Sequence, residues 1–417
     1  MSKTFVLFIC IFLEASHSFC QTDSLKTDSA FQQQDMMDWL ANLSSKPPRP
    51  VKNSFLLLVP YISSNPTSGF NVGLGLTYTY KKSKTDQYLS VITGSVSYST
   101  KKLANISLKS NMYVANGKLN LNGDWRLLIN NNETTYGLGT DKFHNDGVDI
   151  NGVPTEGGSA GQLLKYNLVR FYETASFKLF NIFFAGIGLH YDHYYNIIDD
   201  IFLSGDSARC IHHQHSKENG SNSEDYSIVG VSLNLLFDSR DNQVNAYKGH
   251  FVNVNYRINL TDFGSNQNST VLLTELRSFL PLDRYKRHIL RFWFYGNFVT
   301  SGKVPYLGLP ALGYDQRQRT GRGYKLGQFR GDNLVYGETE YRFPISRNTG
   351  ILGGDVFFNV TSTSDRKNGI WLLDYLRFGY GGGLRIMLDK QSRTRLAIDL
   401  GVSPGSVGFY FGAQETF

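Results

Sequence analysis

The residues whose types and spacing are best suited to a chemical role are Gly321, Arg322, Gly323 and Tyr324. They lie in a glycine-rich stretch without helical periodicity. Arginine carries a permanent charge and five donors in a fixed fork, so a buried Arg322 needs an acidic partner. Long glycine-rich loops are usually either functional or disordered. The surrounding segment, Leu307–Ile345, continues into a strongly alternating strand. The alternative to a buried arginine is one exposed on a surface loop, where this residue type is common.

A second cluster runs from Cys210 to His215 and carries residue types that bind metals. It lies among polar residues with no predicted regular element, so we interpret it as a solvated loop and expect no metal site. His215 with Ser216 and Asn219 is also similar to the His/Ser/Asn set of outer-membrane phospholipases. Because a mobile loop tip orients a nucleophile and its base poorly, we predict no catalytic residue and no enzymatic activity.

Two further polar motifs are predicted to be turns. Asn145–Gly152 combines oxygen ligands with glycines, but it lacks the spacing and the closing glutamate of a calcium-binding loop. Asp238–Asn242 is built from residues that favour turns, and we expect Arg240 to pair locally with Asp238 or Asp241. No cofactor is expected at either motif.

The chain begins with the features of a secretory signal. A positive charge precedes an apolar core at Phe5–Leu13 and a small-residue cleavage site at Ser18–Cys20, so we expect residues 1–20 to be a signal peptide. A lipid anchor on the cysteine of that site is the alternative. Residues 21–54 are polar and rich in Ser, Gln and Pro, which predicts a periplasmic tail or linker with one short amphipathic helix at Met36–Leu43.

The composition favours strands in a membrane. Twenty-five tyrosines, 29 phenylalanines and 41 glycines, with only 18% charged residues, favour strands over helices. No stretch after the leader approaches the roughly twenty consecutive apolar residues of a membrane helix. We therefore predict an all-β transmembrane antiparallel barrel in the bacterial outer membrane, with outer-membrane lipids as partners. The net charge of +7 suits anionic lipid head groups or a basic lumen, and nucleic acid is not an expected partner.

Alternation with a period of two runs through residues 55–417 and defines the predicted barrel domain. At 69–81, for example, apolar side chains alternate with small and polar ones. We predict about sixteen strands, an even number as barrels of this class require. The predicted strands are 55–62, 69–81, 87–99, 103–114, 117–130, 164–176, 179–192, 225–238, 248–260, 268–282, 287–300, 332–344, 350–362, 374–388, 394–402 and 406–417. The long loops near 131–163, 193–224 and 301–331 all follow odd strands, so they emerge at one end, expected to be external.

The sequence resembles the BamA/TamA superfamily of outer-membrane assembly and secretion barrels (the bacterial surface antigen family), in the branch without periplasmic POTRA modules. The resemblance rests first on Gly321–Tyr324 in the sixth external loop and on Glu340, Tyr341, Arg342, Phe343 and Pro344 at the end of strand twelve. Further matching features are Asp238–Asn242, Gly383–Arg385, Leu396–Gly401 and the terminal strand. They follow the family's order over most of residues 55–417.

The resemblance implies that loop six folds into the lumen, where its arginine meets an acidic residue on strand thirteen. In this sequence Asn359 stands at the acidic position of the family. Asp355 lies four residues earlier and points to the same face of the strand. Glu338 and Glu340 point inward on strand twelve by parity. These four residues are the candidate partners of Arg322.

The resemblance also implies a function. It predicts a non-enzymatic barrel that assists insertion or translocation of protein or lipid, with client proteins or accessory outer-membrane or periplasmic proteins as partners. A weak seam is expected between the first and last strands. Gly408, Gly412 and the terminal Phe417 belong to that last strand, and glycine lowers strand stability. The alternative function is a passive pore or small-solute transporter on the same architecture.

Overall fold

The computed structural model describes residues 33–43, 53–65, 69–82, 88–140, 161–203, 205 and 210–413. All of these belong to one compact unit, Gln33–Phe417. The predicted signal peptide, most of the predicted tail, the candidate calcium motif at Asn145–Gly152 and the terminal Phe417 lie outside the described residues. The short amphipathic helix expected in the tail is present as α2, Met36–Leu43.

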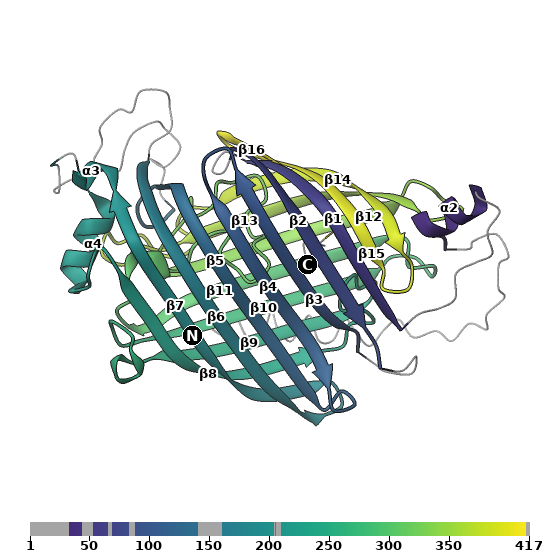
Figure 1. Ribbon diagram of the computed structural model, residues 1–417, viewed down its shortest axis with the longest axis horizontal. Coiled ribbons are helices and arrows are strands. Elements are labelled where there is room, and N and C mark those ends of the chain that lie inside the picture. Colours follow the sequence, from purple (N-terminus) through teal and green to yellow (C-terminus); the bar gives the residue numbers. More distant parts are fainter. Residues whose placement is uncertain are drawn as a thin grey trace. The chain divides into compact units, whose positions relative to one another are not determined.

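Sixteen antiparallel strands form a closed barrel, as the alternating pattern predicted (Figure 1). Each strand pairs with its neighbours in sequence, and β1 also pairs with β16, which closes the sheet. The strands are β1 Ser54–Asn65, β2 Gly69–Tyr80, β3 Ser90–Ser99, β4 Ala104–Val114, β5 Leu119–Thr135, β6 Gln162–Phe180, β7 Phe183–Asp199, β8 Tyr226–Asp238, β9 Gly249–Asn259, β10 Ser269–Pro281, β11 Ile289–Gly302, β12 Asn333–Pro344, β13 Leu352–Thr363, β14 Arg377–Asp389, β15 Thr394–Ser403 and β16 Ser406–Gly412.

Strand β2 shows why these sequences form the wall of a membrane barrel. Its side chains Phe70, Val72 and Leu74 are exposed, whereas Asn71 and Thr77 are buried. Successive side chains of a strand point to opposite faces, so the apolar set lies on the outer surface and the polar set on the inner surface. An apolar outer band and a polar interior are the arrangement that a lipid bilayer requires of a β-barrel.

Strands β6 and β7 are both longer than the predicted 164–176 and 179–192. A tight turn at Asn181, with a φ of 41°, joins them and leaves few residues unpaired. Asp192, where the predicted strand ends, faces inward and pairs with Arg170 of β6 at 2.6 Å. A charged residue that is paired inside the barrel does not end a strand.

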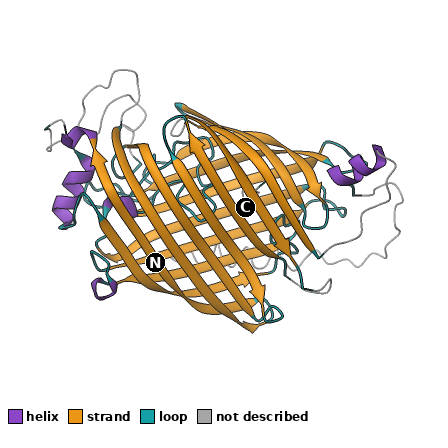
Figure 2. Ribbon diagram, in the orientation of Figure 1, coloured by secondary structure: helices purple, strands orange, loops and turns teal. Residues whose placement is uncertain are grey.

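The loops after β5, β7 and β11 leave the barrel at one end, because all odd-numbered strands run in the same direction. The elements outside the wall are α3 Asp200–Leu203 and α4 Ile211–Asn219 after β7, the 3₁₀ turn η2 Thr261–Phe263 after β9, and the 3₁₀ turn η3 Tyr306–Gly308 in loop six, residues 303–332. Helix α2 lies at the opposite end (Figure 2), where Asp38 pairs with Lys390 at 2.7 Å. No helix in the described part of the chain is long and apolar enough to cross a membrane.

Candidate functional site

Two glycines allow the loop-six motif to lie directly against β15 and β16. Gly321 and Gly323 have φ angles of 82° and 99°, in the left-handed region that residues with a Cβ rarely adopt. A Cβ on Gly323 would also lie 3.0 Å from main-chain atoms of Val402 on β15. The Gly323 N–H donates to the Tyr410 hydroxyl of β16 at 3.0 Å, and the Gly323 carbonyl accepts from Ser403 at 2.9 Å. The motif is therefore docked beside the strand that closes the barrel.

Arg322 is almost fully buried, and its guanidinium meets three carboxylates. Its Nη2 atom pairs with Glu338 and lies 2.8 Å from Oε2 of Glu340, both on β12. Its Nη1 atom lies 3.2 Å from Oδ2 of Asp399 on β15. The guanidinium carbon also lies 3.5 Å from the ring centroid of Phe357. Because an unpaired buried charge is very costly, these carboxylates are what allow Arg322 to be buried.

The Arg322 ion pairs belong to a larger set of buried charges on the inner face of β11–β15, which we call the charged network. Its members are each at most 3% exposed, and they are Arg291, Arg322, Arg342, Arg385, Glu338, Glu340, Asp355 and Asp399. Arg342 pairs with Glu340 at 2.5 Å, and Arg385 pairs with Asp355 at 2.9 Å and with Asp399. With every member ionised, the network is formally neutral, and this mutual pairing offsets the desolvation cost that each charge would carry alone.

The four predicted partners of Arg322 occupy different places around it. Glu338 and Glu340 contact the guanidinium directly. Asn359, at the position where the family has an acid, donates from Nδ2 to the main-chain carbonyl of Arg322 at 3.1 Å. Asp355 forms its ion pair with Arg385 instead of Arg322. The asparagine therefore contacts the main chain of the motif, and the carboxylates that meet the guanidinium come from other strands.

Asp399 was not among the partners of Arg322 predicted from the sequence. The two residues lie 77 positions apart in the chain, and nothing local indicates which inward carboxylate an arginine from a distant loop will reach. The alternation of inward and outward side chains along a strand was the available signal. It places Asp399, which is buried, on the inner face within Leu396–Gly401, one of the stretches that carry the family resemblance.

A second buried arginine holds the end of loop six that leads into β12. Arg330 pairs with Glu133 of β5 at 3.1 Å and donates to the main-chain carbonyls of Tyr306 and Leu307 at 3.2 and 3.0 Å. Glu133 also accepts from the Tyr166 hydroxyl at 2.5 Å. Arg330 and Glu133 are 197 positions apart, and no sequence signal indicated this pair.

The tip of loop six, residues 315–320, folds around Asp315 and contacts β5. The Asp315 carboxylate accepts from the N–H and the hydroxyl of Thr320 at 2.9 and 2.6 Å. Arg126 of β5 donates to the Asp315 carbonyl at 2.9 Å, and Gln316 donates to the side chain of Asn122 at 2.7 Å. Loop six is thus held at its tip, at Arg322 and at Arg330, each time by residues of the barrel wall.

Two other motifs from the sequence have local partners. Arg240 pairs with Asp238 at 2.8 Å, and both side chains are buried, so the predicted local pairing at this turn is confirmed. In the strand-twelve motif, the Tyr341 hydroxyl and Nδ1 of His288 lie 2.7 Å apart. The ring of Phe343 lies 5.8 Å from that of Tyr341. The first contact joins β12 to the residue before β11, and the second lies along β12 itself.

The prediction of a solvated loop at Cys210 and the following histidines is wrong. Cys210 is the N-cap of α4 and accepts from the His213 N–H at 3.3 Å. His212 and Ser216 are buried, and the ring of Tyr306 in loop six lies 5.7 Å from the His212 ring. Burial lowers the pKa of His212 to about 3 and raises that of Cys210 to about 12. The sequence pattern failed here because a distant loop covers polar residues that are locally typical of a surface.

The described residues of α4 do not form a catalytic pair. Ser216 Oγ and His215 Nδ1 are both buried without a hydrogen-bond partner among the residues described, so no base is aligned on the serine. In the same part of the chain, no group of three or more His, Cys, Asp and Glu side chains is placed to hold a metal ion.

Strands β1 and β16 meet over a short distance, which we call the seam. Ser63 and Ser64 of β1 pair with Tyr410 and Phe409 of β16. By contrast, β1 pairs with β2 along all twelve of its residues, and β16 pairs with β15 along all seven of its residues. Gly408 and Gly412 both lie on β16. The barrel is therefore closed by its shortest ladder between described strands.

Comparison with known proteins agrees with this architecture. A family model described as the Omp85 superfamily domain matches residues 61–417. A search of curated proteins finds no match.

Several solved structures share the fold. The crystal structure of BamA from Haemophilus ducreyi lacking POTRA domains 1–3 has a TM-score of 0.54 at 12% identity, covering 88% of this chain and 71% of that one. CdiB from Acinetobacter baumannii has a TM-score of 0.52 at 13% identity, and CdiB from Escherichia coli one of 0.50 at 11% identity. Each CdiB match covers 87% of this chain, which spans 60% and 63% of the two CdiB chains. At these identities the likeness concerns the fold alone.

Proposed function

The chain belongs to the Omp85 superfamily, and we propose that it assists the insertion or translocation of protein, or of lipid, through loop six and the seam between β1 and β16. It is an outer-membrane β-barrel. In this proposal loop six lies in the lumen, and client proteins or accessory outer-membrane or periplasmic proteins are its partners.

The short seam is the observation that carries the proposal. Each net hydrogen bond of a ladder contributes only about 0.5–1.5 kcal/mol to stability. Parting the two positions paired between the described residues of β1 and β16 therefore costs little compared with parting any other pair of described strands. Pro60, in the middle of β1, has no N–H to donate to a neighbouring strand. Proline in a sheet is confined to edges and bulges, which suits a strand that opens toward the bilayer.

Loop six is placed to influence the seam. The Gly323 N–H donates to Tyr410, and Tyr410 is one of the two β16 residues paired with β1. The neighbouring Arg322 is held by the charged network on β12 and β15. A rigidly held loop that contacts the closing strand supports a role for loop six in keeping the seam in register.

A reversible crosslink tests the proposal. Ser64 and Phe409 are paired, and both face outward, so cysteines at these positions would join β1 to β16 without touching the Tyr410 contact. In a Cys210→Ser background, the oxidised Ser64→Cys/Phe409→Cys protein should fail to support client assembly in cells, and reduction should restore it.

The matched control places the pair one ladder away. Val402→Cys with Val407→Cys joins β15 to β16 and should leave assembly intact under the same oxidation. If the seam-locked protein still supports assembly, lateral opening is wrong.

The alternative function is a passive pore or small-solute transporter, which the polar inner surface of strands such as β2 favours. A pore should give a steady ohmic conductance in planar bilayers, and the seam crosslink should leave that conductance unchanged. An insertase should lose activity on crosslinking whether or not it conducts.

A further inference from the structure

Helix α2 carries an exposed apolar face at the end of the barrel opposite the long loops. Trp39, Leu40 and Leu43 are 52%, 47% and 68% exposed to solvent. Residues three and four apart lie on the same side of an α-helix, so these three side chains form one stripe. A contiguous exposed apolar patch on a folded protein marks a contact with another protein or with a membrane.

The other side of α2 is held against the barrel. Asp38 Oδ2 lies 2.7 Å from Nζ of Lys390, which directly follows β14. Just before the helix, the Gln34 N–H donates to the carbonyl of Thr349, in the turn between β12 and β13, at 2.9 Å. Leu43 comes five residues after Asp38, about 1.4 helical turns, so it lies on the far side of the helix. The apolar stripe is therefore turned away from the residues that hold α2.

The turns beside α2 mark where the lipid-facing surface of the barrel ends. After β10, Leu282 is 58% exposed, and Arg284 two residues later is exposed as well. After β12, Ile345 is 45% exposed and is followed in the same way by the exposed Arg347. This is the order expected where hydrocarbon gives way to lipid head groups, because cations reach toward the head groups. Thr349 belongs to the same turn as Arg347, so α2 begins at this boundary.

The same two turns are basic. Arg287 Nη1 of the β10–β11 turn donates to the main-chain carbonyl of Arg347 in the β12–β13 turn at 2.8 Å, so the two turns lie side by side. Residues 282–288 and 345–351 together contain one acidic side chain, Asp283, and four basic ones, Arg284, Lys286, Arg287 and Arg347. Positive charge next to an apolar helix face attracts a surface of anionic lipids.

We propose that α2 and the β10–β11 and β12–β13 turns, together called the rim surface, dock on anionic phospholipids of the periplasmic leaflet. The apolar stripe of α2 enters the head-group region, where tryptophan is favoured. The basic side chains of the two turns contact the lipid phosphates. The long loops of an outer-membrane barrel are external, so the rim surface faces the periplasm.

A lipid leaflet suits the rim surface better than a protein partner, because this surface continues the lipid-facing band of the barrel. On β13 and β14, whose turns hold α2, Val356 and Leu384 are 51% and 44% exposed on the outer face. The exposed apolar side chains thus run from these strands through Ile345 to the stripe of α2. A protein partner would have to cover a surface of which one part already lies in the bilayer.

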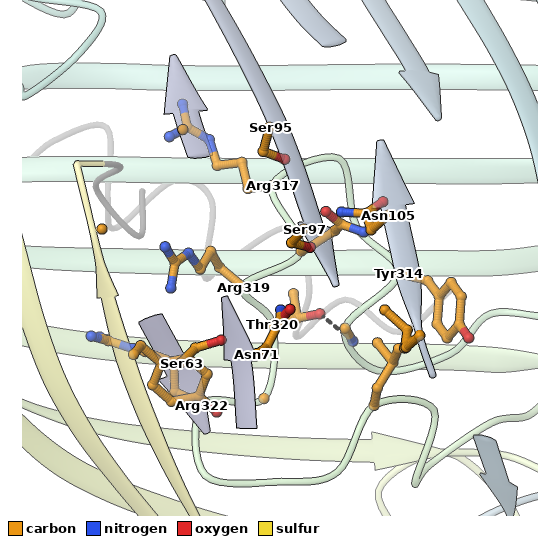
Figure 3. A pocket seen from close by; sticks show the side chains of 18 of the residues that line it. Ser63, Asn71, Ser95, Ser97, Asn105, Tyr314, Arg317, Arg319, Thr320 and Arg322 are labelled. Atoms are coloured by element: carbon orange, nitrogen blue, oxygen red, sulfur yellow. Dashed lines mark hydrogen bonds between the residues drawn. The ribbon is translucent and has the colours of Figure 1, made fainter. Parts of the chain in front are cut away.

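The rim surface is separate from the interior of the barrel. The cavity beside loop six has a volume of about 250 Å³, and the described residues that line it include Ser63, Arg319 and Tyr410 (Figure 3). None of its described lining residues belongs to α2 or to the two turns. Lipid binding at the rim surface is therefore independent of the proposed function.

Fluorescence quenching by brominated phospholipids tests the inference. In a Cys210→Ser background, Leu43→Cys carries a bimane label, and the full-length protein is reconstituted in vesicles of equal parts phosphatidylcholine and phosphatidylglycerol. Lipids brominated in the acyl chain quench only those fluorophores that reach the bilayer. The matched control is the same label in Asn42→Cys, an exposed position four residues after Asp38 and thus on its side of the helix. The label at position 43 should be quenched at least twofold more strongly than the label at position 42.

Charge variants test the role of the turns. At low ionic strength, quenching at position 43 should be stronger with phosphatidylglycerol than in vesicles of phosphatidylcholine alone. The triple variant Arg284→Gln/Lys286→Gln/Arg347→Gln should lose at least half of this gain, and added salt should reduce the gain in the parent protein, because screening weakens the attraction.

The matched control for charge lies at the opposite end of the barrel. It removes three positive charges at exposed lysines and should keep the full gain; its substitutions are Lys102→Gln, Lys217→Gln and Lys303→Gln. A difference in mobility between unheated and heated gel samples verifies that each variant is folded.

Three results would overturn the inference. The first is equal quenching at positions 42 and 43, and the second is a phosphatidylglycerol gain that the folded triple variant retains in full. The third is a label at position 43 that brominated lipids do not reach but that a soluble periplasmic protein shields, which would assign the rim surface to a protein partner.

Discussion

Loop six carries arginines in two opposite electrostatic situations only three residues apart. Arg322 lies in the charged network of β11–β15, where every arginine has a carboxylate neighbour. Arg317 and Arg319 form no ion pair with the described residues, and the guanidinium carbon of Arg319 lies 5.9 Å from the ring centroid of Tyr410 on β16. The charges of the network are therefore paired with one another. The two arginines at the tip of loop six, next to the seam, are not paired with a carboxylate of the described residues.

The comparison predicts the largest effect for Arg322→Ala. Removing this guanidinium takes one positive charge away from the buried carboxylates of Glu338, Glu340 and Asp399. Breaking a buried ion pair in this way costs about 3–5 kcal/mol. Urea unfolding of the protein in detergent micelles should show a loss of this size. Arg347→Ala, at an exposed site, should change stability by less than about 0.5 kcal/mol. Equal stability of the two variants would mean that the charged network does not hold the loop.

The next largest effect is expected at Gly323. An alanine there would adopt a strained φ of 99° and would press on the main chain of Val402, so we expect a loss of about 2–3 kcal/mol from backbone strain and displacement of the strand. Gly369→Ala is the matched control, because its φ is 71° and nothing lies within 4 Å of the added methyl group. That variant should cost about 1 kcal/mol, from the backbone alone. Similar losses of unfolding free energy in Gly323→Ala and Gly369→Ala would show that loop six does not dock closely on β15.

A pH-dependent effect on stability is expected at α4, a third region of the molecule. No carboxylate offsets the charged form of His212 there. Burial, with His215, Arg330 and His213 nearby, lowers the pKa of His212 from about 6.5 to about 3. The folded pKa lies below the unfolded pKa, so the stability of this region is fully present above pH 6.5 and falls as the pH drops toward 3. The loss should reach about 1.4 kcal/mol per pH unit in this window.

Hydrogen exchange of α4 between pH 7 and pH 5 measures this dependence. The amides of α4 should open more often at pH 5 in the native protein. In His212→Gln the extra opening between pH 7 and pH 5 should be smaller, and it should be absent in His212→Gln/His215→Gln, because burial also lowers the pKa of His215, to about 4. A pH dependence that persists in the double variant would assign it to another group.

The smallest effect on stability is expected at Arg317. Since this guanidinium has no carboxylate partner among the described residues, Arg317→Gln should change the free energy of unfolding by less than about 0.5 kcal/mol. The same urea titration used for Arg322→Ala supplies the measurement. A loss comparable to that of Arg322→Ala would show that Arg317 is a structural residue, and the contrast between the charged network and the tip of loop six would fail.

The alternating pattern was sufficient to predict sixteen strands, their order and the placement of the three long loops at one end. It failed at strand ends and in the loops. The predicted strand 179–192 ended at Asp192, whereas β7 continues to Asp199, and the partner of Asp192, Arg170, belongs to another strand. The histidines of α4 seemed solvated, because the residue that covers them, Tyr306, lies in loop six. In both cases the deciding contact came from a distant part of the chain.

The sequence alone determined which side chains face the interior, because the two-residue period of a strand is a local property of the backbone. It also determined that the Arg322 segment could approach a strand closely, because glycine at 321 and 323 tolerates positive φ angles. Only the tertiary structure decided which carboxylate each inward arginine meets. Barrel closure sets the register between strands, and a shift of two residues preserves every inward face while changing every partner across the lumen.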